Sequence, residues 1–143
     1  MVAIVVTLVY LAIQVQQNTD AMRSSTWQST QDAEARFDAM LTQDPVLLDM
    51  FLRGIADGIE ALDTEPEQER FLLVGKQLLD LFQTHHYQHE LGLISDELWA
   101  TWVSQFESGI QDQGMRDIVK SRYPYFRPTF ADFIDEYVEI QTE

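Results

Sequence analysis

The chain has 143 residues, 45% of them apolar, so its length and composition suit one domain with a single hydrophobic core. Its 24 acidic and 9 basic residues give a formal net charge of −15, which argues against a nucleic-acid surface and against adhesion to anionic lipid headgroups, because both need clustered Lys and Arg. The absence of cysteine excludes disulfides, thiol nucleophiles and cysteine-ligated metals.

The sequence at the start of the chain predicts a membrane anchor. Residues 1–13 carry no charge, and they leave none of the polar face that a buried helix of a soluble protein shows. A signal peptide would have a basic start and a small-x-small cleavage site, and neither occurs. The side chains expected to face lipid are Val2, Ile4, Val5, Leu8, Val9, Leu11 and Ile13.

Length limits this interpretation. As a helix, residues 1–13 would measure roughly 20 Å, whereas a bilayer core is about 30 Å thick. We therefore interpret the segment as the C-terminal part of a transmembrane helix, which either begins upstream or enters the bilayer only part-way. A buried helix in an oligomer and a signal-peptide remnant are the alternatives. This reading divides the chain into an anchor, residues 1–17, and an acidic helical domain, residues 18–143.

The exit from the apolar run reads YLAIQVQQNTDAMRSSTWQ, residues 10–28. It resembles the membrane-exit segment of small uncharacterised bacterial proteins, in which a hydrophobic span ends in Tyr-Leu-Ala-Ile-Gln-x-x-Gln-Asn-Thr and leads into a helical domain of about this size. The Asp-Pro at residues 44–45 and the run HHYQHELGLISDELW, residues 85–99, look alike as well. The resemblance implies a membrane-anchored helical architecture over most of the chain and no particular activity.

Helical spacing continues beyond the anchor, with neither Pro nor Gly before Pro45, so we expect the first helix to extend to about Thr42. Asp44 as N-cap and Pro45 at the first helical position begin a second helix, which Gly58 ends. Residues 46–55 are apolar on nearly all sides, which predicts a central position for this helix.

Two further helices follow. Thr64 and Glu67 form a capping box for the third, which Gly92 closes, and Ser95 begins the fourth. Their predicted buried rows are Phe71, Val74, Leu78, Phe82, His85 and His89 in the third helix, and Trp99, Trp102, Val103, Phe106 and Ile110 in the fourth.

The end of the chain predicts two short helices around a corner. The first covers residues 112–120, and residues 121–128 are expected to be extended because Pro124 and Pro128 disfavour the α region for the residues before them. Thr129 with Asp132 is expected to cap the last helix. No segment alternates with a period of two, so the sequence predicts an all-α fold: a long N-terminal helix that continues into a compact domain of about five further helices.

His85 and His89 are the candidate metal ligands, because a spacing of four places both imidazoles on one helix face. A metal needs three or four ligands, however, and this pair lacks the Glu of the H-E-x-x-H motif. The competing interpretation, which we favour, is that both rings extend the buried row of the third helix.

Trp99, Trp102 and Phe106 are candidates for lining an apolar pocket, although core packing explains them as well. There is no phosphate-binding glycine loop and no nucleophile elbow, so we assign no catalytic residue and expect no cofactor.

These observations favour a membrane-anchored, non-catalytic interaction or structural protein that associates with copies of itself or serves as an accessory subunit of a larger membrane complex. Its expected partners are the lipid bilayer and protein, not nucleic acid. Arg23, near the membrane exit, places the domain on the cytoplasmic side by the positive-inside rule. The alternatives are a helical domain that binds a small apolar ligand or lipid, and a metal-dependent enzyme built on His85 and His89.

Overall fold

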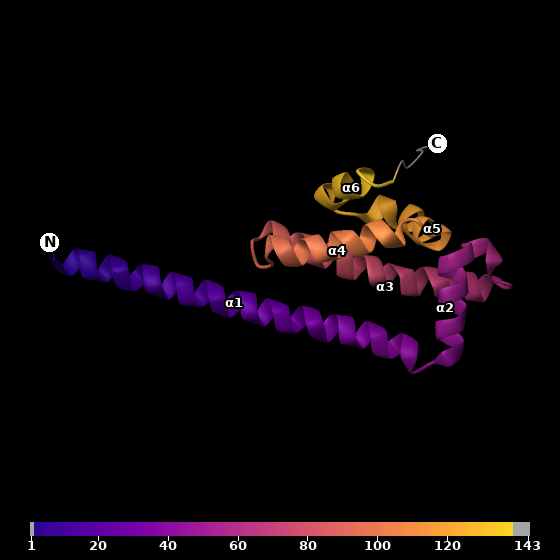
Figure 1. Ribbon diagram of the computed structural model, residues 1–143, viewed down its shortest axis with the longest axis horizontal. Coiled ribbons are helices and arrows are strands. Elements are labelled where there is room, and N and C mark those ends of the chain that lie inside the picture. The colour runs from indigo at the N-terminus through magenta and orange to yellow at the C-terminus, as the bar shows by residue number, and fades with distance from the viewer. Residues whose placement is uncertain (1, 139–143) are drawn as a thin grey trace.

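The computed structural model describes residues 2–138, and of Val2 the backbone alone. Every regular element in this range is helical, which confirms the predicted all-α fold with a long N-terminal helix and five further helices (Figure 1). The elements are α1 (Val2–Thr42), α2 (Pro45–Asp57), the 3-10 helix η1 (Ile59–Ala61), α3 (Glu65–Glu90), α4 (Asp96–Gly109), α5 (Gln113–Arg122), the 3-10 helix η2 (Tyr123–Tyr125) and α6 (Pro128–Asp135).

The centre of the domain is α3, because it packs against all five other α-helices. It runs back alongside the second half of α1, α4 returns along it, α5 and α6 cover its remaining side, and α2 crosses one end (Figure 1). The predicted central position of α2 is therefore wrong. Val46 in α2 is 72% exposed and Leu52 is also exposed, since α2 lies at the edge of the domain, where only one of its faces meets other helices.

The core is rich in aromatic side chains that come from four helices. Phe71 and Phe82 of α3 lie beside Phe51 of α2 and Phe106 of α4 respectively, with ring centroids 5.7 and 5.6 Å apart. The side chains that are least accessible are Phe71, Leu79, Phe106, Ile118, Val119, Phe130 and Ile134. The predicted row of α3 includes Leu78, which is only partly buried, and omits Leu79, which is 1% exposed.

The predicted helix starts in the middle of the chain are confirmed. Asp44 accepts hydrogen bonds from the backbone N–H groups of Val46 and Leu47, at 3.1 and 3.0 Å. Thr64 Oγ1 accepts one from the backbone N–H of Glu67 at 3.3 Å. These side chains satisfy N–H groups that a helix end leaves without an intrahelical partner.

The corner before α6 differs from the prediction. Tyr123, which precedes Pro124, keeps α-helical dihedrals and begins η2, whereas Arg127, which precedes Pro128, is extended as expected. The last helix begins at Pro128 with Arg127 as its N-cap, so the predicted cap by Thr129 and Asp132 is wrong. Pro128 itself supplies the helical φ at the first position, and no side-chain cap is made there.

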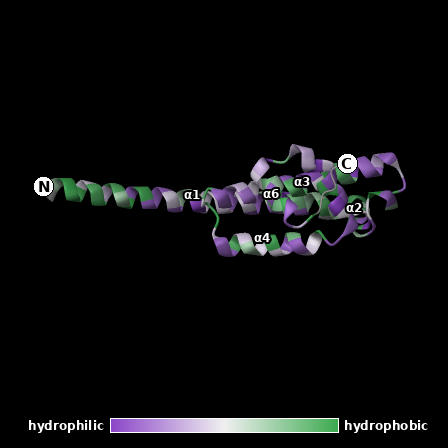
Figure 2. Ribbon diagram, turned by 90° about the horizontal axis from the view of Figure 1, so that it is seen from above, coloured by the Kyte–Doolittle hydropathy of each residue, from purple (hydrophilic) through white to green (hydrophobic). Residues whose placement is uncertain are grey.

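The first half of α1 extends beyond the rest of the domain. The whole helix has 41 residues and so measures about 60 Å, and its N-terminal part has no other element beside it (Figure 1). We call residues 3–18 the projecting segment, because each of their side chains is exposed. Its outer part is the most extended hydrophobic stretch of the ribbon (Figure 2).

Candidate functional site

The projecting segment exposes the predicted anchor side chains rather than burying them in the protein. Its nine large apolar residues, from Ile4 to Val15, are each between 49% and 67% exposed. Residue 1 and the side chain of Val2 lie outside the described residues. Across residues 2–138, no helix holds a stretch both long and apolar enough to cross a membrane.

Three polar side chains of the projecting segment, those of Thr7, Tyr10 and Gln14, form hydrogen bonds within the helix itself. Thr7 Oγ1 donates to the carbonyl oxygen of Ala3 at 2.9 Å, and Gln14 Nε2 donates to Tyr10 Oη at 2.7 Å. A hydroxyl bonded to the preceding turn leaves no free donor on the helix surface. The outer part of the segment, residues 3–13, therefore presents a mainly apolar surface, whereas Gln14, Gln16, Gln17 and Asn18 are exposed polar residues at its inner end.

The domain is attached to α1 just after the projecting segment. Arg23 Nε donates to the carbonyl oxygen of Gly92 at 3.2 Å, which ties α1 to the turn between α3 and α4. About two helical turns further on, the buried Thr30 hydroxyl donates to Gln88 Oε1 at 3.2 Å. The helix runs unbroken through the predicted boundary at residues 17–18, and the side chains of residues 3–18 on its outer side are exposed.

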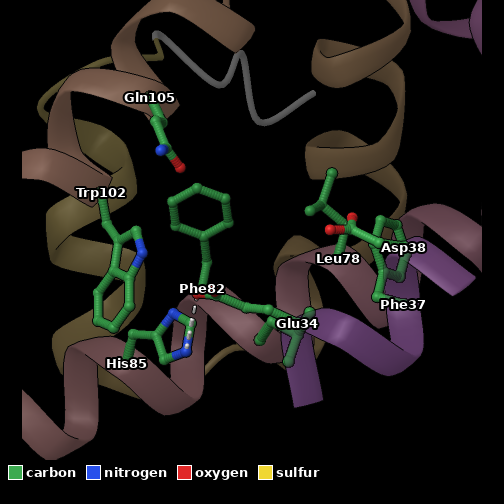
Figure 3. A pocket seen from close by; sticks show the side chains of 9 residues that line it. Glu34, Phe37, Asp38, Leu78, Phe82, His85, Trp102 and Gln105 are labelled. Atoms are coloured by element: carbon green, nitrogen blue, oxygen red, sulfur yellow. Dashed lines mark ion pairs between the residues drawn. The ribbon is translucent and has the colours of Figure 1, made fainter. Parts of the chain in front are cut away.

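A half-open pocket of about 300 Å³ lies between α1, α3 and α4. Figure 3 shows the Phe82 ring of α3 near its middle, with Trp102 and Gln105 of α4 on one side and side chains of α1 on the other. The lining residues are Glu34, Phe37 and Asp38 of α1, Leu78, Leu81, Phe82 and His85 of α3, and Trp102 and Gln105 of α4.

His85 is the most buried polar group of this pocket, with 3% of its surface exposed. Its ring lies flat on the indole of Trp102, with centroids 3.6 Å apart and planes inclined by 10°. Burial lowers the pKa of His85 from 6.5 to about 4, so the imidazole is neutral at pH 7. Its Nε2 lies 3.8 Å from Glu34 Oε1, which is too long for a hydrogen bond.

Glu34 and Asp38 sit one turn apart on α1 and place two carboxylates at the pocket. Burial raises the pKa of Glu34, and the neighbouring charge of Asp38 raises it further, while a hydrogen bond from the Trp102 indole acts in the opposite direction. The sequence analysis did not single out these two acids, because nothing in the local pattern distinguishes them among the 24 acidic residues of the chain.

The other two histidines of α3 have different surroundings. His86 lies within 5.6 Å of the rings of Trp99, Phe130 and Phe133, measured between centroids, and its buried Nδ1 has no hydrogen-bond partner. Burial lowers the pKa of His86. His89 stacks on Trp99 and its Nε2 lies 2.8 Å from Asp96 Oδ1.

His85 and His89, the candidate metal ligands, therefore stack on two different tryptophans, Trp102 and Trp99. Within residues 2–138, no group of three or more His, Asp or Glu side chains is arranged to hold a metal ion. Binding of a metal by the pair stays a prediction for metal analysis of the purified protein.

The three residues predicted to line an apolar pocket have different surroundings in the fold. Trp102 lines the pocket, Phe106 is fully buried in the core, and Trp99 packs against His86, His89 and Phe133. Binding of an apolar ligand by these residues stays a prediction.

Comparison of the chain with protein-family models, with curated proteins and with solved structures finds no match. The functional proposals below therefore rest on the geometry of the projecting segment and of the pocket.

Proposed function

We propose that this chain is a membrane-anchored, non-catalytic interaction protein whose projecting segment inserts into a lipid bilayer. Its acidic domain would then associate, at the membrane surface, with copies of itself or with a larger membrane complex. The observation that carries the proposal is the exposure of all nine large apolar side chains between Ile4 and Val15, on the part of α1 that has no neighbouring element.

Leaving these side chains in water is costly. Burial of one Val, Leu or Ile side chain contributes about 1.5–3 kcal/mol, so the eight of them between Ile4 and Val15 represent on the order of 10 kcal/mol. A helix is suited to lipid because its backbone polar groups bond within the helix, and in this segment the Thr7 hydroxyl does so as well. Residues 3–18 measure about 24 Å as a helix, which reaches most of the way through a hydrocarbon core of about 30 Å.

The hydrogen bond between Arg23 and Gly92 supports a fixed placement of the domain beside the membrane. Arg23 is only six residues beyond Gln17, the last residue of the predicted anchor, which corresponds to about 9 Å along the helix. The domain would therefore stay near the headgroups, although its net negative charge disfavours direct adhesion to anionic lipid. A domain held close to the membrane but repelled by anionic lipid is suited to contact with another membrane protein.

Flotation of the full chain with neutral phosphatidylcholine vesicles tests the anchor. We expect the protein to rise with the vesicles, and recovery of all the protein at the bottom of the gradient would overturn the proposal. Chemical cross-linking in mild detergent tests the interaction role. Dimers or larger species support self-association, whereas a lone monomer with no co-purifying membrane protein contradicts it.

A further inference from the structure

We propose that the pocket between α1, α3 and α4 binds a small organic ammonium ion. Glu34 and Asp38 would meet its charge, and its apolar part would lie against Phe37 and Phe82. The proposal does not depend on membrane insertion, because Glu34 lies about 25 Å along α1 from Gln17, well outside the proposed anchor.

The charge of the lining selects a cation. The pocket contains the carboxylates of Glu34 and Asp38 and no Lys or Arg. Among residues 2–138, neither carboxylate lies within ion-pair distance of a Lys or Arg side chain. An anionic ligand would be repelled, and a purely apolar ligand would bury these carboxylates without compensating their charge.

A second observation is the buried and unpartnered imidazole of His85. Neither of its ring nitrogens makes a hydrogen bond with the residues that the structure describes, although the side chain lines the pocket. A neutral imidazole protonated on Nδ1 presents a lone pair at Nε2. Glu34 Oε1 lies 3.8 Å from this Nε2 (Figure 3). An ammonium nitrogen placed at about 2.9 Å from each atom would donate one N–H to the carboxylate and one to the imidazole.

The walls fit the apolar part of such a ligand. Phe37, Phe82 and Leu78 come from two helices, and aromatic faces attract a cation placed over them. His85 covers one face of the Trp102 indole, which holds both rings in place beside the cavity. A volume of about 300 Å³ is at the lower end for small-molecule sites, so we expect a ligand the size of a single-ring amine.

Isothermal titration of the full chain in mild detergent with benzylamine, at neutral pH, tests the proposal. Benzyl alcohol is the matched probe, because it has the same ring and no charge. We expect saturable binding of benzylamine and at least tenfold weaker binding of benzyl alcohol, since hydrogen bonds to charged groups are the stronger kind. Equal affinity for the two probes, or no binding of benzylamine, would overturn the proposal.

Variants locate the binding. Glu34→Gln should weaken benzylamine binding about tenfold or more, because it removes the charge and keeps the shape. His85→Phe should also weaken it, because a phenyl ring keeps the stack on Trp102 and lacks an acceptor. Asp32→Asn is the control, since Asp32 lies on the same helix and does not line the pocket. Circular dichroism of each variant checks the fold. If Asp32→Asn weakened binding as much as Glu34→Gln, the attraction would come from the net charge and the site would be refuted.

Discussion

Gly114 of α5 packs so closely on Gly54 of α2 that a Cβ atom at residue 114 would overlap the Gly54 carbonyl oxygen. The obstacle is backbone, which cannot rotate away as a side chain does. The contact between α2 and α5 therefore depends on glycine at this position.

The first prediction concerns this contact. Gly114→Ala should lower the melting temperature by about 10 °C or more, because the two helices would have to separate. Gly109→Ala is the matched control: a Cβ there meets only the flexible end of Met115, at 3.4 Å. We expect it to change the melting temperature by less than about 3 °C. Thermal unfolding followed by circular dichroism measures both, and equal effects would show that the close packing is unimportant.

The second prediction tests the anchor with two leucines of equal exposure. Leu8 in the projecting segment and Leu73 in α3 are both 61% exposed. Leu8→Asp should weaken vesicle binding about 100-fold, because a carboxylate inside a bilayer costs about 3 kcal/mol relative to leucine. Leu73→Asp should leave flotation unchanged, since Leu73 belongs to the domain. Loss of flotation in both variants would point to the domain, not the segment, as the membrane-binding part.

The third prediction follows from the pKa of His85, which burial lowers to about 4. The folded protein favours the neutral form of the His85 imidazole. This preference contributes to the free energy of unfolding in full above the unfolded pKa of 6.5, and the contribution is lost as the pH falls towards 4. Between about pH 7.5 and 4.5, the wild-type protein should lose about 2–3 kcal/mol more stability than His85→Phe. Burial shifts the pKa of His86 in the same direction, and the raised pKa of Glu34 acts oppositely.

Denaturant unfolding at several pH values provides this comparison. His85→Phe retains an aromatic ring against Trp102, so it changes titration more than packing. Parallel pH profiles for the wild type and the variant would contradict the role assigned to burial of the imidazole.

The fourth prediction concerns the start of α3. Thr64→Ala should destabilise the protein by about 1 kcal/mol, because it removes the acceptor for the backbone N–H of Glu67. Thr84→Ala on the same helix is the control: the Thr84 hydroxyl donates only to the Asp80 carbonyl, which the helix already uses. We expect Thr84→Ala to be neutral or slightly stabilising in urea unfolding. A destabilisation by Thr84→Ala equal to that of Thr64→Ala would contradict the capping explanation.

Local signals in the sequence were sufficient for most of the helix limits. Asp44, Thr64 and Ser95 each accept a backbone hydrogen bond where a cap was predicted, because capping depends on residues within one turn. Pro128 pushed Arg127 out of the α region, but Pro124 did not do so for Tyr123. The preference before proline is modest, and packing around η2 overrides it there.

Burial was harder to predict than helix limits. The apolar side chains of α2 suggested a central helix, yet Val46 and Leu52 face solvent at the edge of the domain. Trp99 and Trp102 share one predicted stripe and both pack against α3, where His89 stacks on the first and His85 on the second. Periodicity indicates which residues share a face of one helix and does not reveal which neighbour that face meets.

The sequence by itself determined the all-α class, the unbroken first helix and its apolar start, because helix spacing, caps and breakers act within a few residues. Only the tertiary structure decided that α3 occupies the centre and that the side chains from Ile4 to Val15 are exposed. It also decided that Glu34 lies beside His85, which comes 51 positions later in the chain. Those relationships depend on contacts between residues that lie far apart in the chain, and no local pattern encodes them.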